Sequence, residues 1–266
     1  MVTVVTRVRM LGCVSLCVGL AASLGLLGIG QEILEITAWK ATTPIKIDGS
    51  LEEWNTSSPI KISQNSQLIL GDYLWGGSYD LSAVVYIMWD DDYLYIGAEV
   101  QDDVPFTARP GFKPDDADSI GIYISTNPNA DPKRTKYEPT DFRILLMTDG
   151  YEFYTAIDRD MIANRMGIET AGMYGDEQVI LGFEAAVTVT RRGYILEAKI
   201  PFAALSNESL PKFVPQDGLK IKFNVELNDI DMPCPGIGAK TMAWVGSAAI
   251  RTNPSEWGFL VFKSGI

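Results

Sequence analysis

Residues 89–103 read WDDDYLYIGAEVQDD, and this stretch contains the pattern that decides the fold. After three aspartates at 90–92, every second residue is apolar and falls on one side of an extended chain: Leu94, Ile96, Ala98 and Val100. A period of two is typical of a strand with one face on a core. Aspartate suits the preceding turn because its side chain bonds to its own backbone. With 84–88 (VVYIM), the stretch predicts a β-hairpin that turns at 90–92.

Similar short segments recur along the chain, separated by turn residues. They lie at 57–70, 119–125, 141–148, 151–158, 179–189, 194–200, 219–227, 241–246 and 257–262. Many short alternating strands without a long helical period are typical of an all-β sandwich. We therefore expect an antiparallel two-sheet β-sandwich, jelly-roll-like in arrangement, that forms one domain over 31–266. A short helical turn is expected at 50–54, with Ser50 as its cap and Glu53 as the reciprocal partner, so that Trp54 packs on the sandwich.

Composition excludes several classes of function. The chain has 266 residues and a net charge of −12, which argues against nucleic acid because phosphates need Lys and Arg. Histidine is absent, so a Ser-His-Asp triad, a Cys-His pair and a His-ligated metal or haem are impossible. Neutral ligands, divalent cations and a glycosidase with two carboxylates remain open.

Residues 1–30 have the pattern of an export segment. Arg7 and Arg9 precede an uncharged run at 10–30, and polar sequence begins at Gln31. A charged start, an apolar run and a small-residue exit indicate a signal peptide. The run is also long enough to span a bilayer if it is not cut, so a retained membrane anchor is the alternative. In both cases the folded part is expected to be secreted or displayed at the cell surface, with membrane contact only through 10–30.

Two features that the strand pattern does not explain are candidates for ligand binding. The glycine-rich loop 71–80 (GDYLWGGSYD) carries Tyr73, Trp75 and Tyr79, which can form a ligand platform or can cap the end of the core. Arg143 lies inside the predicted strand 141–148. An arginine in a strand needs a partner or a ligand if it is buried, and the alternative is a partly exposed position.

An ordered set of short motifs over about 45–264 resembles carbohydrate-binding module family 9. The motifs are IDG at 47–49 with EW at 53–54, WD at 89–90, LY at 94–95, DSI at 118–120, FR at 142–143, GYILEAKIP at 193–201, FN at 223–224, ND at 228–229, Trp244 and WG at 257–258. The resemblance implies an antiparallel two-sheet sandwich with bound calcium, usually attached to secreted polysaccharide-degrading enzymes. It also implies a non-catalytic role, with a polysaccharide or oligosaccharide as the ligand.

The aromatic clamp that the resemblance implies is not present in this sequence. Sugar-binding members hold a reducing end between two tryptophan rings, because an apolar sugar face stacks on an aromatic ring. In our alignment the two tryptophan positions fall near Asp115 and Arg251, and an expected glutamate falls at Gly121. Arg143 matches the family's polar arginine. We therefore expect ligand contacts from the following residues: Tyr73, Trp75, Tyr79, Phe112 and Arg143.

The densest exposed acids are the expected calcium ligands. They are Asp102, Asp103, Asp115, Asp116 and Asp118. Calcium takes several carboxylate and carbonyl oxygens, and this spacing is not that of an EF-hand loop. The alternative is a solvated acidic rim.

Three other functions remain open at the level of sequence. Haem b-binding electron-transfer subunits that resemble the gamma subunit of ethylbenzene dehydrogenase share this type of sandwich, and their Met and Lys ligation would fall on Met147, Met166, Met173, Met242 or Lys240. A cell-surface structural or filament subunit would self-assemble through an exposed sheet edge. A glycosidase would use Glu99, Glu197 or Glu226, but no spacing pairs them, so we do not expect an enzyme.

Overall fold

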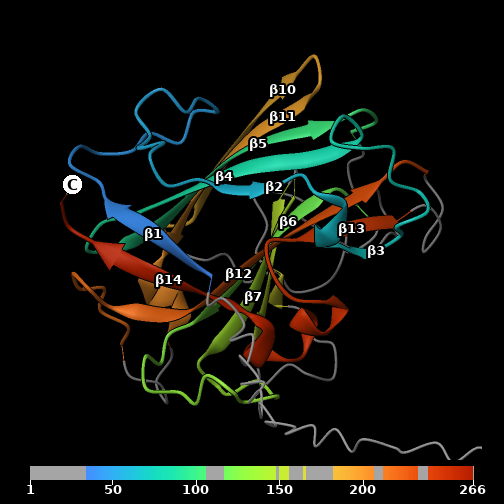
Figure 1. The fold of residues 1–266 in the computed structure, drawn as a ribbon. Helices are drawn as coiled ribbons and strands as arrows, with labels where there is room; N and C mark the ends of the chain where they lie inside the picture. Colours follow the sequence, from blue (N-terminus) through green and yellow to red (C-terminus); the bar gives the residue numbers. More distant parts are fainter. Residues whose placement is uncertain are drawn as a thin grey trace, which may run out of the picture. The chain divides into compact units, whose positions relative to one another are not determined.

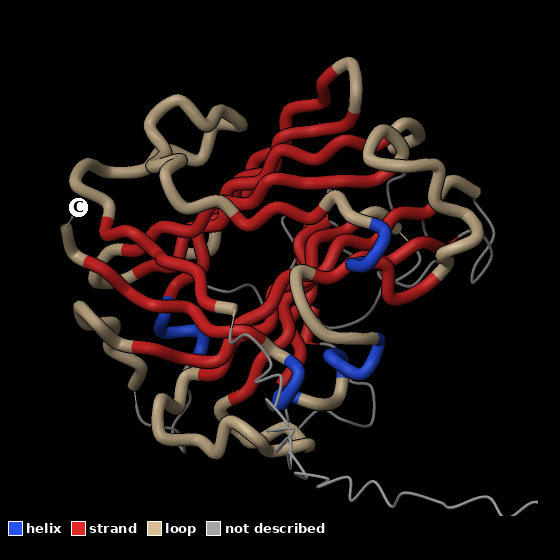
Figure 2. Tube along the Cα trace, in the orientation of Figure 1, coloured by secondary structure: helices blue, strands red, loops and turns tan. Residues whose placement is uncertain are grey.

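The computed structural model describes residues 34–105, 117–147, 150–155, 164–165, 182–206, 212–232 and 239–265. Within these ranges the chain forms fourteen strands and a few single 3-10 turns, without an α-helix (Figure 1, Figure 2). None of the described segments is a helix long and apolar enough to cross a membrane. The predicted signal or anchor segment at 1–30 lies outside the described residues.

The strands follow one another along the chain with few interruptions. They are β1 (Glu35–Lys40), β2 (Ile60–Ile62), β3 (Leu68–Leu70), β4 (Leu81–Trp89), β5 (Tyr93–Asp102), β6 (Ser119–Ser125), β7 (Asp141–Met147), β8 (Gly150–Thr155), β9 (Asn164–Arg165), β10 (Glu184–Thr190), β11 (Gly193–Pro201), β12 (Lys220–Ile230), β13 (Ala239–Ala243) and β14 (Gly258–Lys263). The 3-10 turns are η1 (Asn65–Gln67), η4 (Phe202–Leu205), η5 (Ala248–Arg251) and η6 (Pro254–Glu256).

The hairpin predicted from 84–103 is formed by β4 and β5 and is confirmed. The strands pair from Leu81 opposite Asp102 to Trp89 opposite Leu94. Asp90 holds the turn, because its Oδ1 accepts the backbone N–H groups of Asp92 at 2.8 Å and Tyr93 at 2.7 Å. The local side-chain bonds of aspartate therefore end one strand and begin the next, as the sequence indicates.

Two layers of strands enclose one main core, which confirms the predicted β-sandwich. Hydrogen bonds connect the strands in the order β10-β11-β5-β4-β1-β14-β12-β6-β7-β8-β9. Figure 1 shows β10, β11, β5 and β4 in one layer and β12, β6 and β7 in the other. The apolar residues of β5 meet Ile120, Ile122 and Ile144 from the opposite layer in a single cluster. Burial of this area between two sheets is the main source of stability.

Strand β1 joins the two layers and is the exception to the expected antiparallel pairing. It runs parallel to β14 on one side and to β4 on the other, whereas the other described ladders are antiparallel. The parallel pair of β1 and β14 forms a seam between the layers. The Trp89 indole N–H lies at this seam, 3.1 Å from the carbonyl of Ala38 and 3.2 Å from that of Lys263. The Trp89 ring meets Phe262 edge-on at 5.4 Å. One buried side chain thus ties β4 to both seam strands.

The outer face of β5 is covered by the segment 41–54. Trp54 packs there with Ile45, Met88 and Tyr95, as expected. A single turn forms, with the Trp54 N–H donating to the Leu51 carbonyl at 3.3 Å. The expected reciprocal cap is wrong, because the Glu53 carboxylate accepts the N–H of Lys46 instead.

Candidate functional site

Strand β12 has an apolar side in the core and a buried polar side opposite to it. Its odd-numbered residues from Ile221 to Leu227 enter the main core, as the period of two requires. The polar side consists of Lys222, Asn224, Glu226 and Asn228, all buried. Residues 244–257 lie over this row, since Asn224 Nδ2 donates to the carbonyl of Val245 at 2.9 Å and Lys222 Nζ to that of Trp257 at 2.5 Å. The sequence thus places a row of polar groups where a partner must satisfy each of them.

Glu226 is the centre of this row and joins two arginines. Its Oε1 accepts the guanidinium of Arg143 from β7, and its Oε2 lies 3.1 Å from Nε of Arg251 on η5. Arg251 also donates to Oδ1 of Asn228 at 2.8 Å. Glu226 is fully buried, Arg143 is 7% exposed, and the Arg251 side chain is 32% exposed. Arg251 is therefore the member of this cluster that solvent reaches most easily.

Gly121 makes room for the Glu226 side chain. The two residues are direct partners across β6 and β12. A Cβ at position 121 would stand 2.5 Å from Cγ of Glu226, closer than real side chains approach. The carboxylate that the alignment lacks at Gly121 thus lies over that position from the neighbouring strand.

Electrostatics keep Glu226 charged despite its burial. Burial raises the pKa of the Glu226 carboxyl, but the guanidiniums of Arg143 and Arg251 outweigh it and hold the pKa below its ordinary value. The carboxylate therefore stays ionised and orients both arginines.

Aromatic side chains pack beside this cluster, and the rings of Tyr123 and Trp257 are buried. The Trp257 ring lies 5.4 Å from that of Tyr123 and 5.3 Å from that of Tyr137. The Trp257 indole N–H donates to the carbonyl of Ile250 at 2.8 Å, which fixes the turn that carries Arg251. These rings pack in a small cluster of their own, outside the main core.

Of the three aromatic side chains in the predicted loop 71–80, two are exposed and one packs inward. Tyr73 is 84% exposed and Tyr79 is 63% exposed. The Arg192 guanidinium lies over the Tyr79 ring at 5.1 Å. Trp75 packs against the main core, and its indole N–H donates to the carbonyl of Leu81 at 3.0 Å. Phe112 lies outside the described residues, and a role for this loop in binding stays a prediction.

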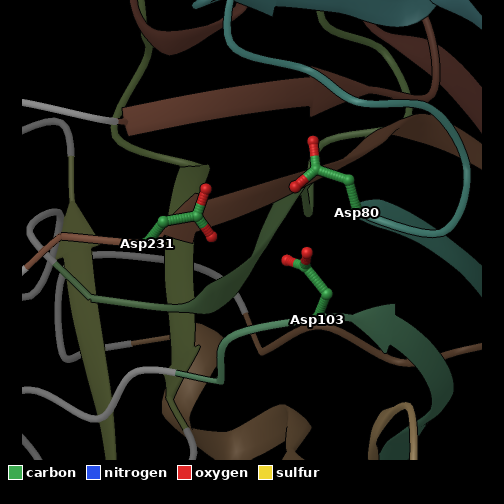
Figure 3. A group of neighbouring side chains, drawn as sticks. All are labelled: Asp80, Asp103 and Asp231. Atoms are coloured by element: carbon green, nitrogen blue, oxygen red, sulfur yellow. The ribbon is translucent and has the colours of Figure 1, made fainter.

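Three carboxylates from distant parts of the chain converge at one end of the sandwich. Asp80 precedes β4, Asp103 follows β5 and Asp231 follows β12, and Figure 3 shows their side chains turned toward a common space. One oxygen from each lies within 4.8 Å of the others. Within the described ranges, Oδ1 of Asp231 is buried and accepts no hydrogen bond. Among the predicted metal ligands that the structure describes, only Asp103 belongs to this group.

The remaining predicted acids lie behind this group or outside the described residues. Asp102 and Asp118 are buried, and their side chains bond to each other. Burial raises the pKa of Asp102. Each also accepts a backbone N–H, from Val104 at 2.8 Å and Ile230 at 2.9 Å respectively. Asp115 and Asp116 fall outside the described residues.

Lys240 is the cation within this acidic end. Its buried ammonium contacts Asp80, lies 2.7 Å from Asp231 and lies 3.0 Å from Asp229. Burial lowers the pKa of Lys240, but the bonds with Asp231 and Asp80 outweigh it and raise the pKa above its usual value. Burial raises the pKa of Asp229 to about 8, and Asp102 and Asp231 add to this. One ammonium thus contacts three carboxylates, those of Asp80, Asp229 and Asp231.

The sequence gives little sign that Asp80, Asp229 and Asp231 belong with Asp103. Asp80 and Asp103 stand far from Asp229 and Asp231 along the chain, and the one local signal is the acidic pair at 229 and 231, at the end of β12. Of the suggested haem ligands, Lys240 is bonded to carboxylates and Met242 lies in the main core. Met166 and Met173 lie outside the described residues.

The suggested glycosidase glutamates occupy three different environments. Glu99 on β5 is exposed, whereas Glu197 and Glu226 are fully buried. Glu197 accepts the backbone N–H groups of Asp48 at 2.9 Å and Ser50 at 3.1 Å, and the Trp54 indole N–H at 2.7 Å. Glu226 is held between two arginines. The two buried carboxylates are therefore bonded within the protein.

Two xylanases are similar in sequence to this chain over most of its length. Endo-1,4-beta-xylanase A from Thermoanaerobacterium saccharolyticum is 27% identical over 207 residues, which is 76% of this chain and 14% of the xylanase. Endo-1,4-beta-xylanase A from Thermotoga maritima is 28% identical over 233 residues, 86% of this chain and 18% of that protein. The chain therefore spans less than a fifth of the length of either relative.

Solved structures share the fold at low sequence identity. A carbohydrate binding module family 9 from Caldicellulosiruptor kristjanssonii in complex with cellotriose has a TM-score of 0.57 and 21% identity, over 88% of this chain and 95% of that one. The same module in complex with glucose has a TM-score of 0.56. The sequence profile of "Carbohydrate family 9 binding domain-like" matches residues 47–265. These findings confirm the resemblance inferred from the sequence motifs, and the chain belongs to the carbohydrate family 9 binding domain-like family.

Proposed function

We propose that this protein is a non-catalytic carbohydrate-binding module whose ligand is an oligosaccharide or the end of a polysaccharide. The observation that carries this proposal is the cluster of Arg143, Glu226, Asn228 and Arg251, which lies beside the packed rings of Tyr123 and Trp257. Family membership and the complexes of the similar modules with cellotriose and glucose support it.

The chemistry of the cluster suits a polyhydroxyl ligand. Guanidinium groups donate hydrogen bonds, and carboxylate and amide oxygens accept them, so hydroxyl groups can bond to both kinds. Fixed charges make such bonds stronger than those between neutral groups. A ligand would contact Arg251 first, because its side chain is the most exposed in the cluster.

Titration calorimetry with cellotriose tests the proposal. We expect binding by the wild-type protein, and at least about a tenfold loss in Arg251→Gln, which corresponds to losing a charged hydrogen bond. Arg191→Gln, on the exposed β10–β11 turn, is the matched control and should bind as the wild type does. Tyr73→Ala and Tyr79→Ala report whether the loop 71–80 takes part. If no oligosaccharide on a glycan array binds the wild-type protein, the proposal is wrong.

We also propose that calcium binds where Asp80, Asp103 and Asp231 converge. The donor set fits a hard cation, since each residue offers a carboxylate oxygen and three carboxylates in this region share the single ammonium of Lys240. A bound cation would join the ends of β5 and β12 to the loop before β4. On this basis calcium stabilises the module and does not contact the sugar site.

Thermal unfolding in calcium and in a chelator tests this second proposal. We expect calcium to raise the melting temperature of the wild-type protein, as a ligand of the folded state must. Asp103→Asn should remove that rise. Asp91→Asn, just before the start of β5, is a matched control that should keep it. Equal melting temperatures with and without calcium would contradict the proposal.

We infer that the module acts outside the cell, because the sequence pattern of 1–30 favours export. Fractionation of cells that express the full chain, with N-terminal sequencing of the product, tests this. A product that begins after residue 30 supports a cleaved signal peptide, and an intact chain in the membrane fraction supports an anchor. Intact chain in the cytoplasm alone would contradict export.

A further inference from the structure

Lys240 is a lysine at a core-facing position of its strand. It shares one face of β13 with Met242, which lies in the main core, because side chains two residues apart in a strand point the same way. Its side chain is fully buried, and it stands directly opposite Asp229 on β12. A buried ammonium is costly unless carboxylates pair with it, so the acids around Lys240 determine where it can lie.

The ammonium is bonded to two of the three carboxylates that are proposed to bind calcium. Lys240 Nζ donates to Oδ1 of Asp80 and, at 2.7 Å, to Oδ2 of Asp231. The other oxygen of Asp80 accepts the backbone N–H of Gly76 at 2.5 Å. A cation that binds Asp80 must therefore share an oxygen with one of these donors or take it from the ammonium.

The ammonium does not satisfy all the acceptors around it. Within the described part of the chain, Oδ1 of Asp231 and Oδ1 of Asp229 are buried and accept no hydrogen bond. Asp229 is itself fully buried, and its Oδ2 lies 3.0 Å from the ammonium, so its carboxylate points to the same place. Asp103 is exposed and completes the group at the surface. An ammonium satisfies few acceptors, whereas calcium takes about six to eight oxygens, so this donor set suits the larger demand.

We propose that Lys240 is a built-in competitor of calcium, and that the ion binds by taking the carboxylates of Asp80 and Asp231 from its ammonium. The inference rests on the proposed calcium site and specifies what sets its affinity. The same carboxylates cannot serve both cations fully, because two positive charges a few ångströms apart repel each other. The lysine thus weakens calcium binding, and it stabilises the protein when calcium is absent.

This competition also selects among ions by their charge. A monovalent ion that displaced the ammonium would bring only an equal charge, and the hydrogen bonds of Lys240 would be lost. A divalent ion brings the additional attraction that can offset this loss. We therefore expect calcium to raise the melting temperature, whereas sodium chloride at the same ionic strength, the control for screening, should not.

Calorimetric titration with calcium and melting curves of Lys240→Met test the proposal. Methionine keeps a long unbranched side chain and removes the charge. We expect the variant to bind calcium at least about tenfold more tightly than the wild type. Without calcium it should melt at a lower temperature, because buried carboxylates lose their cation, and with calcium it should show the larger rise. Lys199→Met breaks a surface ion pair with Glu184 and is the matched control, which should bind calcium as the wild type does.

The contrary outcomes separate this inference from the calcium proposal. Unchanged or weaker calcium binding by a folded Lys240→Met protein overturns the competition and leaves the calcium site intact. Binding by Lys240→Met alone supports the competition but contradicts calcium as a ligand of the wild-type protein. If neither protein binds calcium, both proposals fail.

A measurement on the wild-type protein covers the case in which Lys240→Met does not fold. The side-chain ammonium signals of buried lysines can be followed by NMR during titration with calcium. We expect the Lys240 signal to shift and its protons to exchange faster with water, and a chelator should reverse both changes. The Lys222 signal is the internal control, because that ammonium is held by the carbonyls of Ser255 and Trp257 and should not respond. A calcium-induced rise in melting temperature that leaves the Lys240 signal unchanged would overturn the proposal.

Discussion

At the scale of single residues, the buried carboxylate of Glu197 holds the segment 48–54, which precedes β2, in place. Glu197 on β11 gathers the backbone N–H groups of Asp48, Gly49 and Ser50 on one oxygen, and the Trp54 indole N–H on the other. Four donors from one short segment thus converge on a single buried carboxylate and fix the path of that segment. The sequence marks each of these residues as unusual, but it does not show that they meet, because Glu197 is remote from the turn along the chain.

Removing a carboxylate oxygen from Glu197 should destabilise the protein without changing its fold. Glu197→Gln keeps the shape of the side chain but places an amide where backbone donors converge, so we expect a loss of about 2 kcal/mol, as for buried donors left without an acceptor. Urea denaturation measures this loss. Glu99→Gln, on the exposed face of the adjacent β5, is the control and should stay within about 0.5 kcal/mol of the wild type. Equal effects of the two changes would contradict this role for Glu197.

Lys222 should make the stability of the protein depend on pH. Burial lowers its pKa from 10.5 to about 8, with smaller contributions to the same shift from the charges of Arg134 and Lys220. Between these values the unfolded chain binds more protons than the folded protein, so the free energy of unfolding should rise with pH. Chemical denaturation from pH 8 to pH 10 should show this rise, with the upper limit set by tyrosine ionisation in the unfolded chain. Lys222→Met should remove the rise, and the exposed Lys61→Met should retain it. A flat profile in the wild-type protein would refute this.

At the scale of elements, the alternation in 93–100 predicts β5 because the strand meets the core on one face alone. Leu94 and Ile96 lie in the main core, while Tyr95 lies in the separate cluster under 41–54. Parallel pairing of β1 could not be predicted in the same way. A parallel ladder needs no local turn, and its partner β14 lies at the far end of the sequence, so no short-range pattern records it.

Trp89 should be the most sensitive side chain of this seam. Trp89→Phe removes the indole N–H that lies near the Ala38 and Lys263 carbonyls, and it leaves a cavity in a fully buried place. We expect a loss of about 2–3 kcal/mol from the lost hydrogen bonds and the cavity together. Trp75→Phe also loses an indole hydrogen bond, but in a partly exposed loop, and should have a smaller effect. Denaturant midpoints of the two variants test this order, and the reverse order would count against it.

At the scale of the whole sandwich, residues far apart in the sequence gather in two polar clusters. The acidic end combines residues before β4, after β5 and after β12, and the cluster around Glu226 combines β7, β12 and η5. The motifs in the sequence are sufficient for the fold and the family, since they follow the order of the strands. Asp231 and Glu226 could not be assigned from the sequence, because their partners are set by strand order and not by spacing along the chain.

The parallel seam also determines how the domain responds to a mechanical load. Glu35 pairs with Phe259, and Trp39 with Lys263, so the first and last strands point the same way. A pull on residue 34 and an opposite pull on residue 264 slide β1 along β14 and load all their hydrogen bonds at once. An antiparallel hairpin pulled at its open end instead loses its bonds one after another. The sandwich is thus built to resist stretching between these two points.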